Sequence, residues 1–223
     1  MFLIGDVHGN FNRYHNFCKK LPESLQLGDM GVGFPDESKS NSLQTKVLTR
    51  PKSINLNHKF ICGNHDDYQY ASTLPNCLGR FGYIEESGIF YISGGFSIDK
   101  QYRTPGINWW PSEQLDANEM IQCMALYKKV RPEAVCSHEC PTVAKYWSLF
   151  YSGKNKGFSS RRGYSASYTE MLLNDLYVEH APKYWIHGHF HQFYTKEEGC
   201  TLFVGLDELI SGKKENCIYE IKT

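Results

Sequence analysis

Five short stretches of the sequence place metal-binding side chains directly after an apolar run. They are Gly5-Asp6-Val7-His8, Gly28-Asp29, Gly63-Asn64-His65-Asp66, Ser137-His138 and Gly188-His189-Phe190-His191. Imidazole nitrogens, together with carboxylate and amide oxygens, suit divalent ions such as manganese, iron and zinc. Their recurrence predicts a metal centre, whereas any single stretch is equally typical of a polar strand end with solvated histidines.

The apolar runs before these stretches have the length of buried strands. They cover residues 2–4, 24–27, 59–62, 134–137 and 184–186. Helical patterns at 10–20, 112–130 and 166–179 separate several of them. This alternation predicts an α/β fold in which the carboxyl ends of the strands meet at one ligand site.

The remaining patterns concern a helix start and a second sheet. Pro111 and Ser112, with Glu113 in the first turn, are typical of a helix start. Apolar runs at 89–93, 201–204 and 217–221 predict hairpin-like strands of a second sheet. The sequence shows no linker, repeat or low-complexity tract, so we expect a single domain over residues 1–223.

The composition argues against several classes of protein. Among 223 residues, 24 basic and 24 acidic side chains balance, so no global field attracts long nucleic acid or an anionic membrane. No apolar stretch reaches the ~18 residues of a membrane helix, and the start MFLIGD is not typical of a signal peptide. The eight cysteines form no C-x-x-C pair and are typical of reduced, mostly buried thiols, which predicts a cytoplasmic protein.

In this order, the five stretches resemble the motifs of the calcineurin-like metallophosphoesterase superfamily, and they span residues 5–191. The resemblance implies a four-layer αββα fold, that is, a two-sheet β-sandwich flanked by helices. It also implies a pair of divalent ions, with manganese favoured over iron, zinc, magnesium or nickel. Asp29 would bridge the two ions. The implied ligands are Asp6, His8 and His191 for one ion, and Asn64, His138 and His189 for the other. A water between the ions would attack phosphorus in line with the leaving oxygen.

Four polar residues lie in or beside these motifs, and they are not among the implied metal ligands. It implies that His65 faces the substrate, as a general acid or as a stabiliser of transition-state charge. His187 precedes the Gly-His-x-His motif, and we favour a buried histidine with a hydrogen bond over a residue that orients a ligand. Asp66 is more typical of a helix cap than of a residue that orients the site. Asn10 fits a phosphate contact and a helix cap equally well.

The sequence departs from the phosphoprotein-phosphatase branch of the superfamily. That branch carries Gly-Asp-x-Val-Asp-Arg-Gly, where this chain has Val32 and Gly33 in place of the second Asp and the Arg. It also carries an Arg before Gly-Asn-His, where this chain has Cys62. The arginines that grip phosphate in that branch are therefore missing.

Two other groups of basic residues remain as candidates for phosphate binding. Arg103 offers bidentate geometry, although a lone loop arginine is more often solvated. The stretch 148–168 holds Lys154, Lys156, Arg161 and Arg162 among aromatic residues and contains no acidic side chain. Such a loop suits a nucleotide or RNA end, with a mobile solvated loop as the alternative.

We therefore expect metal-dependent hydrolysis of small or nucleotide-type phosphodiesters or monoesters. The alternatives are a phosphoprotein phosphatase, a nuclease acting on RNA or DNA, and an inactive metal-binding scaffold. The neutral charge disfavours the nuclease, and the full ligand set with His65 disfavours the scaffold. The expected partner is a phosphoester substrate, with no membrane and no long nucleic acid.

Overall fold

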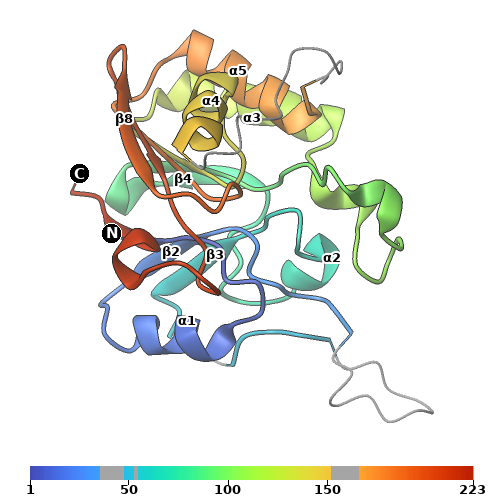
Figure 1. Cartoon of the computed structure of the whole chain (residues 1–223). Coiled ribbons are helices and arrows are strands. Elements are labelled where there is room, and N and C mark those ends of the chain that lie inside the picture. The colour runs from blue at the N-terminus through green and yellow to red at the C-terminus, as the bar shows by residue number, and fades with distance from the viewer. Residues whose placement is uncertain (36–47, 53–54, 152–165, 223) are drawn as a thin grey trace.

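Two β-sheets form the centre of the molecule (Figure 1). The computed structural model describes residues 1–35, 48–52, 55–151 and 166–222. The first sheet has the strand order β10-β1-β2-β3, and the second has the order β4-β5-β6-β7-β9-β8. The strands of the first sheet are β1 (Phe2–Ile4), β2 (Ser24–Leu27), β3 (His58–Ile61) and β10 (Ile218–Glu220). The strands of the second sheet are β4 (Phe81–Ile84), β5 (Ile89–Ile92), β6 (Ala134–Ser137), β7 (Tyr184–His187), β8 (Tyr194–Glu198) and β9 (Thr201–Gly205).

In the first sheet, β1, β2 and β3 run parallel, whereas β10 pairs antiparallel with β1. The expectation that 217–221 joins the second sheet is therefore wrong. Leu3 lies opposite Tyr219 in this pairing. The strand covers the otherwise open edge of β1, and Ile221 beyond it is buried in the apolar layer between the sheets.

In the second sheet, β5, β6, β7 and β9 run parallel between antiparallel edge strands. Successive residues of a strand point to opposite faces. On β7, Trp185 therefore packs with the cluster that includes residues of the covering helices, whereas Ile186 packs with residues of the first sheet. Both faces are buried, as parallel sheets require.

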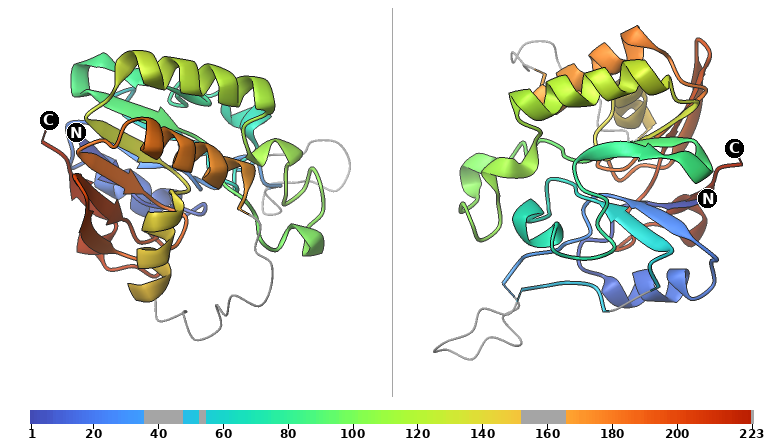
Figure 2. Two further views of the ribbon diagram at one scale, coloured as in Figure 1. Left: turned by 90° about the horizontal axis from the view of Figure 1, so that it is seen from above. Right: turned by 180° about the vertical axis from the view of Figure 1, so that it is seen from behind.

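Helices cover the outer faces of both sheets. The views in Figures 1 and 2 place α3, α4 and α5 over the six-stranded sheet and α1 below the four-stranded one. The helices are α1 (Phe11–Cys18), α2 (Tyr68–Ala71), α3 (Ala117–Val130), α4 (Thr142–Tyr151) and α5 (Tyr168–Glu179). Short 3-10 turns cover Glu85–Ser87, Lys100–Tyr102, Pro111–Glu113 and Lys214–Asn216. The αββα architecture expected from the resemblance is confirmed.

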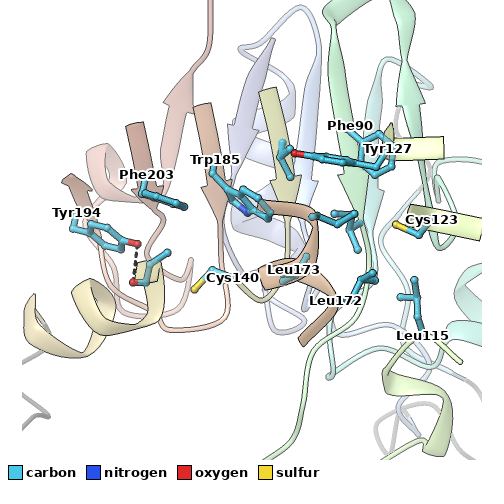
Figure 3. Packing of buried hydrophobic residues seen from close by; sticks show 14 residues of the cluster. Phe90, Leu115, Cys123, Tyr127, Cys140, Leu172, Leu173, Trp185, Tyr194 and Phe203 are labelled. Atoms are coloured by element: carbon cyan, nitrogen blue, oxygen red, sulfur yellow. Dashed lines mark hydrogen bonds between the residues drawn. The ribbon is translucent and has the colours of Figure 1, made fainter. Parts of the chain in front are cut away.

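Aromatic rings fill the layer between the six-stranded sheet and its helices (Figure 3). The Trp185 ring stacks on Phe203 at 6.2 Å between centroids, and Phe90 meets Tyr127 edge-on at 5.1 Å. The Tyr194 hydroxyl donates a hydrogen bond of 3.0 Å to the Ala144 carbonyl of α4. This layer anchors β6 and β7, the two strands of this sheet that precede candidate ligands.

The start of α3 differs from the expectation. The helix begins at Ala117 rather than at 112, and Pro111–Glu113 form a separate 3-10 turn. Asp116 accepts a hydrogen bond from the Glu119 amide, and the Glu119 carboxylate accepts one from the Asp116 amide. This capping box satisfies two amides at once and therefore fixes the helix start.

The loops after the parallel strands meet at one edge of the sandwich. The His8 amide donates to the Asp29 carbonyl at 2.8 Å, and the Gly188 amide donates to the His138 carbonyl at 3.2 Å. The Gly94 amide, after β5, donates to the Cys62 carbonyl at 2.7 Å and so links the two sheets. Among the described residues, no helix has the length and apolar character needed to cross a membrane.

Candidate metal centre

The candidate ligands stand on backbone that non-glycine residues rarely adopt. Among the described residues, five other than glycine have positive φ, and four of these are His8, Asp29, His189 and His191. Such conformations cost free energy and persist where the surrounding structure holds them, typically at functional sites. Glycine allows the neighbouring chains to approach, because a Cβ on Gly63 would collide with the Asp29 carboxylate.

One group of ligand atoms gathers at the ends of β1, β2 and β7. Asp6, His8, Asp29 and His191 offer atoms that all lie within 4.8 Å of one another. The Nε2 atom of His191 is 3.0 Å from Asp6 Oδ2 and 2.9 Å from His8 Nε2. Asp6 is fully buried and also accepts the His189 amide. This group has the donors and the spacing that suit a divalent cation.

A second group surrounds the imidazole of His138, which is fully buried. Its Nδ1 lies 2.8 Å from the Leu27 carbonyl, which can only accept, so this nitrogen carries a proton. Its Nε2 faces Asn64 Oδ1 at 3.1 Å, Asp29 Oδ1 at 3.2 Å and His189 Nδ1 at 3.2 Å. The Asn64 amide nitrogen donates to Ser97, which turns its oxygen toward the group. Four acceptor-type atoms thus converge with a fixed orientation.

The electrostatics of both groups favour a cation. Burial is the largest single influence on Asp29 and raises its pKa, but the neighbouring imidazoles, His138 above all, together hold this pKa well below its usual value. Burial likewise opposes the ionised form of Asp6, yet the hydrogen bond with His191 lowers its pKa. Burial lowers the pKa of His189 to about 3, so this ring stays neutral, as a metal ligand must. Burial lowers the pKa of His138, but the charges of Asp29 and Asp6 raise it to about 10, so the two buried carboxylates attract positive charge, as a site for divalent ions must.

Asp66 holds two ligand loops together rather than capping α2. Its carboxylate accepts hydrogen bonds from the amides of Met30, Gly31, Val32 and Gly63, at 2.8–3.1 Å. The cap of α2 is Asp67, whose side chain accepts from the Gln69 and Tyr70 amides. The expectation that Asp66 caps the helix is therefore wrong, because the cap is the next residue. Asp66 instead fits the alternative, a residue that orients the site.

His65 and Arg103 lie together beside the first group. The His65 ring is 5.1 Å from the His8 ring, and its amide donates to Asp29 Oδ1 at 2.7 Å. Arg103 places its two terminal nitrogens 3.1 Å from the ring nitrogens of His65. Asp99 holds the guanidinium through Nε at 2.7 Å and a terminal nitrogen at 2.8 Å. Arg103 is thus fixed at the site, and the solvated-loop interpretation is wrong.

The other candidate substrate contacts have different outcomes. The Asn10 side-chain oxygen accepts from the Arg13 amide at 3.3 Å and caps α1, so the structure places it as a cap. Its contact with phosphate stays a prediction. Arg161 and Arg162, with Lys154 and Lys156, lie outside the described residues.

His187 is a buried histidine outside both groups, as favoured above. Its Nδ1 lies 2.9 Å from the Gly188 carbonyl, and its Nε2 lies 2.8 Å from the Tyr194 hydroxyl. Burial lowers its pKa to about 4, so the ring is neutral. Its ring nitrogens therefore contact Gly188 and Tyr194 rather than the candidate ligand atoms.

We expect His191→Ala to lose bound metal and activity, while His187→Ala keeps both within about twofold. Loss of the buried hydrogen bonds of His187 should cost about 1–3 kcal/mol and lower Tm by several degrees. Metal content from plasma mass spectrometry, turnover and thermal melting of both variants provide the measurement. Metal loss in His187→Ala with retention in His191→Ala would show that the register of the histidine cluster is wrong.

Sequence reasoning missed two residues at the site. Glu208 follows β9, and its Oε2 lies 3.7 Å from His191 Nδ1 and 4.0 Å from His8 Nε2. The signal was present, because Asp207-Glu208 is another acidic pair directly after an apolar run. Phe34 lies parallel to the His65 ring at 6.4 Å between centroids and meets Trp110 edge-on at 4.8 Å. No local pattern marked Phe34.

Comparisons with known proteins match the chain to a family of phosphoesterases. The model of the family described as calcineurin-like phosphoesterase matches residues 2–193. The chain is 27% identical over 206 residues to the lariat debranching enzyme of Entamoeba histolytica, with 86% of this chain and 55% of that protein covered. The chain thus spans about half the length of this curated relative.

Proposed function

The chain belongs to the calcineurin-like phosphoesterase family, and from this premise we propose that it hydrolyses small or nucleotide-linked phosphodiesters with two divalent ions. The position of Asp29 is the observation that carries the proposal. Its Oδ1 lies 3.2 Å from His138 Nε2, and its Oδ2 lies 3.7 Å from His8 Nε2. One carboxylate therefore faces both groups of ligand atoms, as chemistry with paired metals requires.

The proposed ligands divide between two ion positions that share Asp29. Asp6, His8 and His191 serve the first position, and Asn64, His138 and His189 serve the second. Bound ions of this kind polarise phosphoryl oxygens and lower the pKa of bound water. Manganese is the metal that we propose, because carboxylate and amide oxygens suit it while imidazole is tolerated.

His65 and Arg103 are the proposed contacts to the reacting phosphate. The half-buried His65 ring lies at the edge of the first ligand group, where it can give a proton to the leaving oxygen. Asp99 holds the guanidinium of Arg103 by two hydrogen bonds, so little rotamer freedom is lost when it binds a phosphoryl oxygen. We therefore propose that His65 protonates the leaving oxygen and that Arg103 binds a phosphoryl oxygen of the substrate.

A cavity beside the ligands supports a small organic group on the phosphate. Its volume is about 310 Å³, close to the lower end for small-molecule sites. It is lined by His8, Gly9, Gly31, Phe34, Thr49 and His65. The Phe34 ring offers an apolar face, which suits a nucleobase. The relative named as a lariat debranching enzyme also supports a nucleic-acid-type diester.

The alternative function, a phosphoprotein phosphatase, has less support from the residues around the candidate metal centre. Val32 is fully buried in the layer below the first sheet, and Gly33 has a φ of 92°. A phosphate-gripping side chain therefore does not reach the site from these positions. Arg103 alone supplies less charge than a dianionic monoester can use.

Comparison of substrate classes tests the proposal. The full chain loaded with Mn²⁺ is assayed on bis-nitrophenyl phosphate, nitrophenyl phosphate, cyclic nucleotides and phosphopeptides. We expect diesters to be cleaved at least as well as monoesters, and phosphopeptides poorly. Strong hydrolysis of phosphoserine or phosphotyrosine peptides, with none of bis-nitrophenyl phosphate, would overturn the proposal.

Arg103→Ala should raise KM for nucleotide substrates by roughly 10–100-fold, with kcat less affected. The range follows from the ~1.5–3 kcal/mol of a hydrogen bond to a charged group. Lys100→Ala is the matched control, because Lys100 lies on the 3-10 turn directly before Arg103 but is exposed and packs over Phe96. Steady-state kinetics on a cyclic nucleotide provide the measurement. Equal KM values for wild type and Arg103→Ala would show that Arg103 does not bind the phosphate of the substrate.

A further inference from the structure

We propose that Glu208 is a positioning residue for the first ion position, where its carboxylate faces the His191 and His8 imidazoles and raises the affinity for a divalent cation. The inference rests on the metal positions proposed above. Glu208 lies beyond residues 2–193, so the family match does not cover it. It reaches the site because β9 lies next to β7 in the sheet.

The geometry of His191 gives Glu208 this role. The Nε2 atom of His191 faces Asp6 Oδ2 at 3.0 Å and His8 Nε2 at 2.9 Å. Glu208 Oε2 lies 3.7 Å from His191 Nδ1 and 4.0 Å from His8 Nε2, so this oxygen stands beside both imidazoles. At these distances Glu208 makes no hydrogen bond to either ring, so it acts on both through the charge of its carboxylate.

Glu208 is held in place by its own loop. The Leu209 amide donates to the Asp6 carbonyl at 2.7 Å, so this loop and the ligand loop after β1 are joined. The Ser211 hydroxyl donates to Glu208 Oε1 at 2.6 Å, and Oε2 is the oxygen nearest the imidazoles. Arg13 of α1 donates to the Leu209 and Gly212 carbonyls at 2.5 and 2.8 Å and fixes the turn from outside.

The surroundings of Glu208 make its charge effective. The side chain is 17% exposed, so water screens it less than a surface carboxylate. Within the described chain, its ion pairs are with His8 and His191, both ligands of the first position. It is 4.0 Å from His8 Nε2, so a third carboxylate joins Asp6 and Asp29 near that position. The extra negative charge favours a doubly charged ion over an empty site.

Metal binding tests this role without any substrate. Full-length chain is stripped with a chelator and titrated with Mn²⁺ by calorimetry. Glu208→Ala should weaken the first binding event about 10–100-fold, the usual effect of losing a residue that lies directly behind the metal ligands. Glu208→Gln should weaken it by a similar factor, because this variant keeps the shape of the side chain and loses only its charge.

Glu215→Gln is the matched control. Glu215 lies on the nearby 3-10 turn, is exposed, and should leave the Mn²⁺ affinity unchanged. Thermal melting of the metal-free variants shows whether each one folds, and Glu208→Gln keeps the shape of the native side chain. Unchanged Mn²⁺ affinity in folded Glu208→Ala and Glu208→Gln would overturn the role of Glu208. Tight Mn²⁺ binding by wild type without any diester hydrolysis would instead overturn the proposed function alone.

Discussion

Asp29→Asn should remove bound metal from both positions and reduce turnover by at least ~10³-fold. The replacement keeps the shape of the side chain and an oxygen that can accept from the His65 amide. It removes the charge that faces His138 on one side and His8 on the other. Metal ions supply several kcal/mol of transition-state stabilisation, and each ~1.4 kcal/mol is tenfold in rate.

Metal analysis by plasma mass spectrometry, together with kinetics on bis-nitrophenyl phosphate, measures this effect. Asp67→Asn is the matched control, because Asp67 caps α2 and an asparagine side chain can also cap a helix. We expect the control to keep its metal and its turnover. Full metal content and full turnover in Asp29→Asn would contradict the bridging role. Loss of a single ion would assign Asp29 to one position only.

The candidate ligand loops were predictable because metal chemistry restricts residue types and strand ends restrict their places. Asp6, Asp29 and His138 each follow a short apolar run, and the carboxyl ends of parallel strands meet at one edge. The sequence also contained the fold class, because strands and helices alternate. Local patterns therefore predicted the fold class and the candidate metal centre, but not the sheet to which residues 217–221 belong.

Features that depend on pairing between distant segments were not predictable. The sequence shows a carboxylate at Glu208, but only the order β7-β9-β8 places it beside His191. The pairing of β10 with β1 joins opposite ends of the chain, and no local signal encodes it. Arg103 was undecided because its position depends on the hydrogen bonds to Asp99 and to the Asn108 carbonyl.

Competing local signals caused the remaining errors. Pro111 and Asp116 both resemble helix starts, and the reciprocal hydrogen bonds of Asp116 and Glu119 favour the second. Asp66 and Asp67 are adjacent acidic residues before α2, and only Asp67 caps the helix. Asp66 is drawn inward because four loop amides need an acceptor in a buried place.

His65→Ala should keep both metals while turnover falls by roughly 10²–10⁴-fold, the usual range for a positioned proton donor. The metals stay because the hydrogen bond from residue 65 to Asp29 comes from the backbone amide, which alanine retains. His15→Ala on α1 is the matched control, because His15 lies outside both ligand groups. Metal content should be the same in wild type and in both variants.

The leaving group distinguishes two roles for His65. A nitrophenolate leaves without protonation, whereas the alkoxide of a ribose needs a proton as its bond to phosphorus breaks. If His65 donates that proton, the loss in His65→Ala should be large for a cyclic nucleotide and small for bis-nitrophenyl phosphate. If His65 only stabilises charge on the phosphoryl oxygens, both substrates should lose the same factor. An equal loss would therefore remove the proton-donor role, and a loss of metal in His65→Ala would remove both. Rate constants for the two substrates, measured at saturating Mn²⁺, decide between these outcomes.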